Sequence, residues 1–285
     1  MSGSALLDRV TPGDHVCWVV DDDRVRADTI ASFFIAGLRA RHRVIYSGDQ
    51  PELVLAALRA RGADPAEPLR TGSLVADVPE SSYLAAGYFD PEAVLAGWAA
   101  ERERARSEGY LGMRVVGDMS WARRDIPGAD RLAWYETMVN TIISDGFVAG
   151  VCAYDRRVFE ALDLREFMWT HQGAAATGMP YDPATSLRVR RVPAGLVLSG
   201  EADRSNRTAL AAVVDQLFDD VGDDEREMVI DVSELRFADT AVARILVQAA
   251  HHGRVRVVGC SPALRRLLGF TGAAEAPGLT VDGGV

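Results

Sequence analysis

The sequence contains no lysine, so all 31 residues of the Lys and Arg class are arginine. Without a lysine amine the chain cannot form a Schiff base with a substrate or use a lysine as general base. It also lacks the lysine with which a P-loop contacts the β- and γ-phosphates of a nucleotide. The absence therefore excludes lysine-dependent catalysis and a complete P-loop.

Cysteines and long apolar runs are scarce as well. Cys17, Cys152 and Cys260 are widely spaced and odd in number, which is typical of reduced thiols. No run of about 18 apolar residues is present, and the first residues lack the pattern of a secretory signal. The formal charge of −10 disfavours binding to nucleic acid phosphates. We therefore expect a cytoplasmic location and no direct contact with a membrane or with nucleic acid.

The length indicates two globular units, because 285 residues exceed the usual size of one domain. Residues 172–186 are small and polar and include two prolines, which is typical of a linker. We therefore expect one unit at residues 1–171 and a second at residues 187–285.

The first unit alternates apolar strand patterns with helical patterns. The expected strands are residues 15–20, 43–48, 73–78, 113–121 and 147–155. The expected helices are residues 28–42, 51–62, 91–109 and 128–146. This alternation predicts a parallel sheet with helices on both faces. The second unit has a different order, with a strand hairpin at 187–203 followed by alternating helices and strands, which predicts another α/β fold.

The loop after the first strand, "DDDRVRAD" at residues 21–28, lies where a nucleotide-binding loop would begin. A phosphate cradle needs glycines so that successive backbone N–H groups can turn toward the anion. This loop has no glycine and places Asp21, Asp22 and Asp23 side by side. We therefore expect no ATP hydrolysis and no cofactor.

The first strand, "HVCWVV", places His15 and Cys17 on one face because strand side chains alternate. Cys152 and His171 are the plausible donors that could complete a tetrahedral metal site with them. Neither CxxC nor HxxxH spacing supports such a site. We therefore favour a structural role for these residues and expect no metal.

Residues 10–171 resemble the MEDS sensory domain, a family named from methanogen and methylotroph proteins. The resemblance rests on "GDHVCWVVDDD", "FFIAGLRARHRVIYSGD", "MRVVGDMSWARRDIPGADRLAWYE" and "GVCAYDRRVF", which match in order and spacing. It implies a degenerate P-loop or RecA-like fold that has lost its nucleotide loop, in agreement with the chemistry of residues 21–28. It also implies a sensor of small, often hydrophobic molecules.

A ligand pocket in a parallel α/β sheet is expected at the carboxyl ends of the strands. With the donors on the first strand, the expected ligand-binding residues are His15, Cys17, Asp21, Asp49, Asp118, Trp121, Tyr154 and Asp155. An aromatic wall with a few carboxylates suits a small organic ligand. The alternative is that the aromatic residues pack in the core and the aspartates cap helices.

Residues 187–285 resemble the STAS domain of anti-sigma factor antagonists through "GLVLSGEADRSNRTAL", "MVIDVSELRFADTAVARIL" and "RVRVVGCSPALRRLLGFTG". In that family a strand enters a helix through a pattern like Asp-Ser-Ser-Gly, whose second serine accepts phosphate. The matching residues here are Asp239, Thr240, Ala241 and Val242. The resemblance implies loss of the usual switch, because alanine has no acceptor oxygen. Thr240 could accept a phosphate or cap the helix.

Together these patterns predict a non-enzymatic signalling protein without catalytic residues. The first unit would sense a small molecule, and the second would relay its state to an anti-sigma factor or related regulator of transcription. One alternative is a phosphorylation-controlled anti-sigma factor antagonist with Thr240 as acceptor. Another is an enzyme that acts on a nucleotide or small substrate through Asp118 and Asp155. The identities of ligand and partner, and the formation of a homo-oligomer, stay open.

Overall fold

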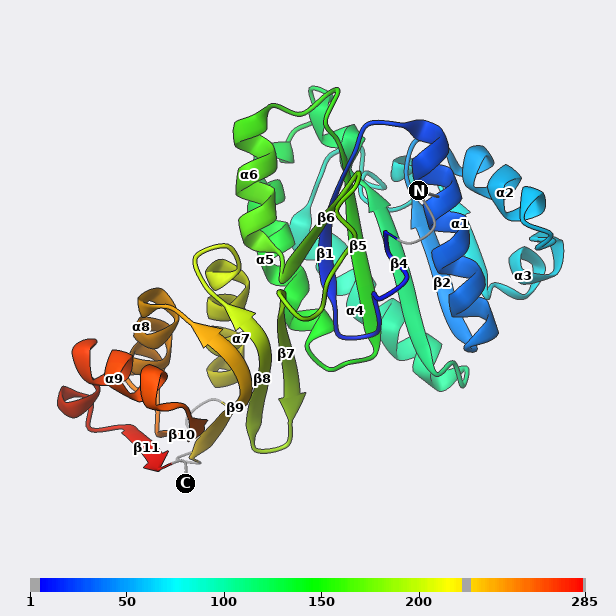
Figure 1. The fold of residues 1–285 in the computed structure, drawn as a ribbon. Helices are drawn as coiled ribbons and strands as arrows, with labels where there is room; N and C mark the ends of the chain where they lie inside the picture. The colour runs from blue at the N-terminus through cyan, green and yellow to red at the C-terminus, as the bar shows by residue number, and fades with distance from the viewer. Residues whose placement is uncertain (1–5, 222–226, 284–285) are drawn as a thin grey trace.

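The computed structural model describes residues 6–221 and 227–283 and shows two α/β units, each with its own sheet (Figure 1). Within these residues, none of the helices is both long and apolar enough to span a bilayer.

The first unit is built on a parallel sheet of six strands in the order β3-β2-β4-β5-β1-β6. Its strands are β1 (His15–Val20), β2 (His42–Ser47), β3 (Leu74–Asp77), β4 (Gly112–Asp118), β5 (Val148–Asp155) and β6 (Gly173–Ala176). Its helices are α1 (Asp23–Arg39), α2 (Pro51–Ala60), α3 (Ala66–Thr71), α4 (Pro91–Ser107), α5 (Leu132–Ile143) and α6 (Ala161–Thr170). The parallel pairing confirms the fold predicted for this unit.

Alternation of side chains along the strands divides the core of this unit into two layers. On one face Phe33 and Phe34 of α1 pack against Trp18 and other apolar strand residues. On the other face, which α4, α5 and α6 cover, Cys17 and Tyr154 lie in a second apolar cluster. Figure 1 shows the helices on both faces of the sheet. The two faces are chemically different, because the second carries the cysteines and most of the tyrosines of the core.

Part of the segment that we expected as a linker belongs to the first sheet. Residues 173–176 form β6, which pairs in parallel with β1 at the sheet edge. Tyr181 is buried against the α1 face of the core. The sequence Gly-Ala-Ala-Ala lacks branched apolar residues, so its pattern did not indicate a strand. The connection outside both sheets is therefore residues 177–186.

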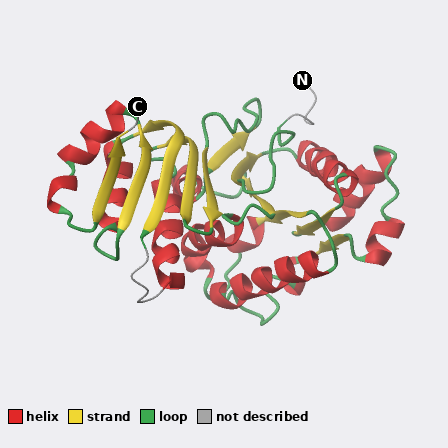
Figure 2. Ribbon diagram, turned by 90° about the horizontal axis from the view of Figure 1, so that it is seen from below, coloured by secondary structure: helices red, strands yellow, loops and turns green. Residues whose placement is uncertain are grey.

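The second unit has five strands in the order β11-β10-β9-β8-β7. Its strands are β7 (Leu187–Val192), β8 (Gly195–Ala202), β9 (Met228–Ala238), β10 (Val255–Cys260) and β11 (Leu279–Gly283). Its helices are α7 (Arg207–Val221), α8 (Thr240–Ala249) and α9 (Pro262–Phe270). The β7–β8 pair is the antiparallel hairpin predicted from the sequence, and the other pairs are parallel. Figure 2 shows this sheet on its left side, with the helices packed against it.

An ion pair between a buried carboxylate and a partly exposed arginine joins the two units. The Asp14 side chain is fully buried and accepts hydrogen bonds from Arg188 Nε at 2.8 Å and Arg188 Nη2 at 2.7 Å. Arg188 lies on β7, which also donates Leu187 N–H to the Gln172 carbonyl at 3.0 Å. The units are therefore connected by specific polar contacts as well as by the packing of α5 on α7.

Replacement of Arg188 by alanine should destabilise the protein, because it leaves the Asp14 carboxylate buried without its cation. Removing one partner of a buried pair typically costs about 3–5 kcal/mol. We expect roughly 2 kcal/mol here, since the Arg188 side chain is 35% exposed and partly screened. Chemical denaturation followed by circular dichroism measures the change. Arg190→Ala, at an exposed position of the same strand, is the control. Equal stability of the two variants would contradict the assignment.

Candidate functional site

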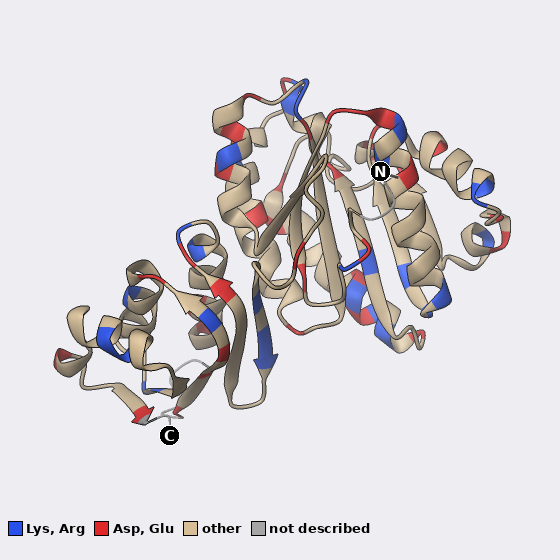
Figure 3. Ribbon diagram, in the orientation of Figure 1, with Lys and Arg blue, Asp and Glu red and all other residues tan. Residues whose placement is uncertain are grey.

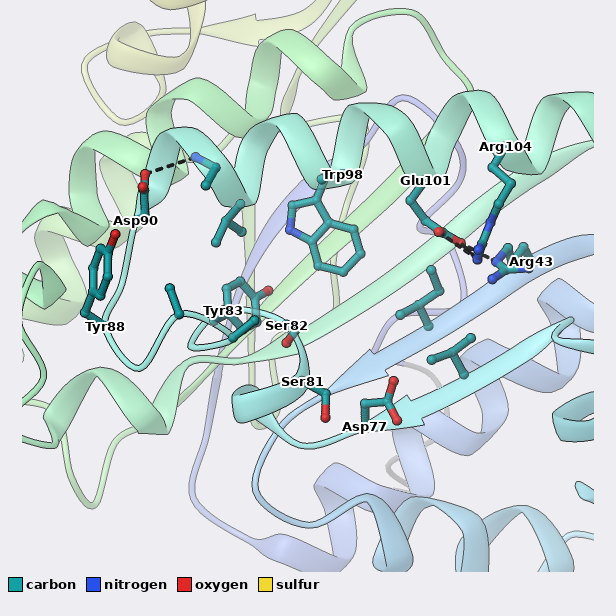
Figure 4. Close-up of a pocket in the computed structure, with 17 residues that line it drawn as sticks. Arg43, Asp77, Ser81, Ser82, Tyr83, Tyr88, Asp90, Trp98, Glu101 and Arg104 are labelled. Atoms are coloured by element: carbon teal, nitrogen blue, oxygen red, sulfur yellow. Dashed lines mark hydrogen bonds and ion pairs between the residues drawn. The ribbon is translucent and has the colours of Figure 1, made fainter.

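A cavity of about 420 Å³ lies between α4 and the β2–β3 edge of the first sheet (Figure 4). Apolar side chains of both strands and of α4 form most of its walls, among them Ile45, Val75 and Val94. Tyr83 and Trp98 also line it, and Figure 4 shows the Trp98 ring projecting from α4 toward the strands. A concave, mainly apolar space of this size is typical of small-molecule sites.

Charged residues close one end of this cavity. The Arg43 side chain is only 5% exposed, and its Nε lies 2.5 Å from Glu101 Oε1. Arg104 Nη2 lies 2.8 Å from the other oxygen of Glu101. Glu108 lies 3.3 Å from Arg43 Nη1, so two carboxylates balance the two guanidinium groups, and this end offers hydrogen-bonding groups without a strong net field.

Polar groups also lie where β3 ends. Asp77, Ser81 and Ser82 line the cavity there, and the Ser82 hydroxyl forms a short hydrogen bond with the Ser47 hydroxyl. Asp90 caps α4 by accepting a hydrogen bond from the Ala93 N–H. The cavity therefore combines apolar walls with a small number of polar groups.

A second, smaller cavity of about 40 Å³ lies deeper in the unit. Tyr83 and Trp98 line both cavities, so their rings form the wall between them. The Trp98 indole N–H donates to the Tyr135 hydroxyl at 2.9 Å, which holds this wall in place. The inner cavity ends at His15 and Cys152.

Four chemically active side chains meet beside the inner cavity. The ligand atoms of His15, Glu136, Cys152 and His171 all lie within 4.8 Å of one another, and all four residues are buried. His15 comes from β1, Cys152 from β5 and Glu136 from α5, whereas His171 follows α6 directly. The structure thus brings together three of the four donors considered from the sequence, leaves Cys17 outside the group, and adds a carboxylate that was not foreseen.

The surrounding residues hold this cluster in position. His15 Nδ1 lies 3.1 Å from Asn140 Oδ1, and the Tyr154 hydroxyl donates to Glu136 Oε1 at 2.5 Å. Burial, with a smaller contribution from His15, lowers the pKa of His171 to about 3, so its imidazole is neutral. Burial next to Glu136 raises the pKa of Tyr154, which remains a phenol and a donor. Gly150 provides space for the His15 ring, because a Cβ there would lie 3.3 Å from His15 Cδ2.

The aspartates expected in a pocket lie instead in a network of ion pairs at the carboxyl ends of the strands. Figure 3 shows acidic and basic residues interspersed at this edge. The pairs are Asp21 with Arg156, Asp49 with Arg124, Asp118 with Arg26, and Asp155 with Arg157 and Arg26. Asp118 also accepts a hydrogen bond from the Ser120 N–H, as a helix cap does.

The two expected aromatic residues are core residues. Trp121 and Tyr154 are both fully buried; Trp121 stacks on Tyr83 at 5.4 Å between ring centroids, and Tyr154 stacks on Phe167 at 4.7 Å. Cys17 is also buried, outside the four-residue cluster. None of the eight expected ligand-binding residues lines the cavity under α4. The sequence did not predict Arg43, Trp98 and Glu101 as lining residues, because nothing in their local patterns indicates a shared cavity.

Glu136 was missed for a different reason. It lies on α5 among buried apolar residues such as Leu132, Tyr135 and Ile143. A single acid on the apolar face of a predicted helix was the available signal, because such a position requires a buried partner.

The corner of the second unit differs from the expectation for Thr240. Asp239 caps α8 by accepting the Val242 N–H at 3.0 Å. Thr240 is exposed, and within the described chain no group is hydrogen-bonded to its hydroxyl. The aspartate therefore performs the capping role that the sequence left open for the threonine.

The turn after β1 is unsuited to a nucleotide phosphate. The Asp22 carboxylate accepts the N–H groups of Arg24 at 2.8 Å and Val25 at 2.9 Å, which are the donors that a phosphate would use at a helix N-terminus. The Arg26 guanidinium is held by Asp118 at 2.9 Å and by Asp23 at 2.9 Å. The Asp22 carboxylate thus occupies the position where a phosphate would bind, and the nearby Arg26 cation is already paired with carboxylates of the protein.

Millimolar Mg²⁺-ATP should therefore leave the melting temperature unchanged. A ligand that binds only the folded state raises this temperature by mass action, so differential scanning fluorimetry detects binding directly. ADP and buffer alone serve as controls. An increase that requires both Mg²⁺ and the γ-phosphate would contradict this expectation and favour the enzyme alternative.

Comparisons with known proteins agree with the two units. The MEthanogen/methylotroph, DcmR Sensory domain (MEDS) matches residues 14–172, and the Mlab-type STAS domain matches residues 186–280. No curated protein shows significant similarity to the chain. The matches confirm the expected order of a MEDS domain and a STAS domain.

Two archaeal proteins of known structure are similar in overall arrangement. The flagellar accessory protein FlaH from Methanocaldococcus jannaschii is 10% identical, with a TM-score of 0.42 over 69% of this chain and 82% of FlaH. A KaiC-like protein from Pyrococcus horikoshii is 12% identical, with a TM-score of 0.42 over 68% of this chain and 82% of its own. Similarity at this level carries no argument about function.

The first unit has the parallel sheet with helices on both faces that was expected, and it is followed by the expected STAS-like α/β unit. The matched families are sensory and regulatory, which indicates a role in signalling. Because the MEDS match spans more than half of the 285 residues, the chain belongs to the MEDS family.

Proposed function

We propose that the protein senses a small, mainly apolar organic molecule and relays its state through the STAS unit to a protein that controls transcription. The observation that carries this proposal is the cavity of about 420 Å³ under α4. Its volume lies within the range of roughly 300–1,000 Å³ that is common for small-molecule sites.

The lining of the cavity favours a neutral ligand. Most of the wall is aliphatic or aromatic, so binding would gain from removing apolar surface from water. Arg43 and Glu101 are already paired, and a charged ligand would have to break that pair or remain without a counter-ion. Ser81 and Asp77 can orient a molecule that carries one hydroxyl or carbonyl group.

A continuous set of contacts leads from the cavity to the STAS unit. Arg102 of α4 donates to the Ile142 carbonyl at 3.1 Å and pairs with Asp145 at 3.0 Å, both at the end of α5. The adjacent Ser144 carbonyl accepts the Arg191 N–H of β7 at 2.7 Å. A ligand that shifts α4 would therefore act on α5 and on β7, provided that it binds the two arrangements of the units with different affinity.

The STAS unit offers a surface for a partner near its corner. Phe237 is 51% exposed and Phe270 is 83% exposed, and both line a groove between β9 and α9 with Arg236 and Arg266. Exposed aromatic residues beside arginines are suited to a partner that presents apolar and acidic side chains. We propose an anti-sigma factor or a related regulator as that partner.

Gly97 provides a direct test of the cavity. It lines the cavity from α4, and a Cβ at this position meets nothing within 4 Å. Gly97→Phe should fill the space and abolish binding, whereas Gly97→Ala adds one methyl group and should preserve it. A library of small alcohols, halocarbons and aromatics, screened by thermal shift, should contain compounds that stabilise the unmodified protein. Stabilisation of about 2.7 kcal/mol is expected when the ligand concentration is 100 times Kd.

Two outcomes would contradict the proposal. In one, no compound stabilises the unmodified protein. In the other, the same compounds stabilise Gly97→Phe to the same extent, which would place their site elsewhere.

The phosphorylation alternative has one supporting observation, the exposed Thr240 hydroxyl at the start of α8. Under our proposal, Thr240→Ala leaves partner binding unchanged within about twofold, because Asp239 supplies the cap. Pull-down with the partner and mass spectrometry after incubation with its kinase measure both properties. Phosphate on Thr240, together with lost partner binding in Thr240→Glu but not in Thr240→Val, would favour the alternative.

A further inference from the structure

The buried cluster beside the inner cavity has the properties of a metal site. We propose that His15, Glu136, Cys152 and His171 bind one divalent ion of the zinc type in the core of the MEDS unit. The spacing of these residues in the sequence favoured a structural role, but the geometry of the folded chain points to coordination. This inference is independent of the ligand proposed for the cavity under α4.

Four of the six separations between the donor atoms lie in or just below the range of a tetrahedral zinc site. Zinc–ligand bonds of about 2.0–2.3 Å place neighbouring donors about 3.3–3.7 Å apart. Here Glu136 Oε2 lies 3.5 Å from His15 Nε2 and 3.5 Å from His171 Nε2. Cys152 Sγ lies 3.2 Å from the same oxygen and 3.5 Å from His15 Nε2. All four donor atoms lie within 4.8 Å of one another, so they are close enough for one ion to contact all four side chains.

The hydrogen bonds of the two rings determine which nitrogen carries the proton. The Asn140 amide N–H₂ donates to carbonyl oxygens of Glu136 and Thr170, so its Oδ1 faces His15 and must accept from His15 Nδ1. His171 Nδ1 lies 2.7 Å from the Phe167 carbonyl oxygen and must donate to it. In the neutral rings both Nε2 atoms therefore present lone pairs toward Glu136.

With both rings in the neutral form, this arrangement has no positive charge at its centre. Two nitrogen lone pairs face one carboxylate oxygen, and the Cys152 thiol is the only one of the four groups that has a proton to donate there. His171 Nε2 is buried and has no hydrogen-bond partner among the described residues. An unsatisfied buried polar atom is costly, and a cation accepts all of these lone pairs at once.

The outer contacts also match those of metal-binding histidines, which usually donate their second nitrogen to a carbonyl or carboxylate. Asn140 and the Phe167 carbonyl provide this support for His15 and His171, and Tyr154 orients Glu136. Imidazole and thiolate favour zinc over magnesium or calcium. On binding, the Cys152 thiol loses its proton to solvent, so one thiolate and one carboxylate balance the charge of the ion.

A bound ion would also link the core to the STAS unit. His171 is followed by Gln172, whose backbone N–H donates to the His15 carbonyl at 3.1 Å. The Gln172 carbonyl in turn accepts the Leu187 N–H of β7. Coordination of His15 and His171 would therefore fix the position of Gln172, whose carbonyl accepts the hydrogen bond from β7.

The test uses the full-length protein. After removal of metal with a chelator and addition of Zn²⁺, elemental analysis should find one zinc per chain in the unmodified protein. Substitution with Co²⁺ should give the intense visible bands of a tetrahedral site and a near-ultraviolet thiolate-to-cobalt band. Cys152→Ser should remove the thiolate band, and both Cys152→Ser and His171→Ala should weaken binding by about 100-fold or more.

Two cysteines serve as matched controls. Cys17→Ser changes a buried thiol outside the four-residue cluster, and Cys260→Ser changes one in the STAS unit, so both should retain the thiolate band. Circular dichroism confirms folding of each variant, and the spectrum of the unmodified cobalt protein tests thiolate ligation even where a variant does not fold. Gly97→Phe should bind zinc normally, which separates this test from that of the cavity.

Three results would overturn the inference. They are the absence of stoichiometric zinc in folded protein, a cobalt spectrum without a thiolate band, and a thiolate band that is lost in Cys17→Ser but retained in Cys152→Ser.

Discussion

The fully buried carboxylate of Glu136 constrains the whole MEDS unit. Burial of an ionised group costs several kcal/mol unless compensating partners surround it. The Cys152 thiol and the Tyr154 hydroxyl of β5 donate to this carboxylate, and His15 of β1 and His171 after α6 lie 3.5 Å from it, so these elements must meet α5 in one register. The need to compensate one charge thus determines how the α5 face of the sheet is packed, and apolar burial alone would permit several arrangements.

The same helix connects this core to the STAS unit. Glu136 lies near the middle of α5, and the Ser144 carbonyl just beyond its end accepts a hydrogen bond from β7. Gln172, next to His171, provides a second connection to β7. Ligand binding under α4 and metal binding in the buried cluster would therefore both act on β7. This strand is the element where the two binding events could be combined.

The sequence predicted the layers of the fold better than its sites. Alternation correctly placed His15 and Cys17 on one strand face, because that property is local. The partnership of His15 with Glu136 depends on helix packing across 121 positions of the chain, which no local pattern contains. The location of the cavity depends on how α4 lies over β2 and β3. The sequence did not predict β6, because its small side chains show no apolar periodicity. Its backbone nevertheless pairs in parallel with that of β1.

The turn after β1 places a side chain of the protein itself where a helix N-terminus can bind an anion. A helix N-terminus attracts an anion through its free N–H groups, and here the Asp22 carboxylate of the chain itself takes that place. Arg26, which is buried, pairs with Asp118 and neutralises part of the acidic edge. Once these groups satisfy one another, the carboxyl edge of the sheet no longer requires a ligand for its stability. The α4–α5 face of the sheet, in contrast, has a cavity of about 420 Å³ and the buried His171 Nε2, which has no hydrogen-bond partner among the described residues.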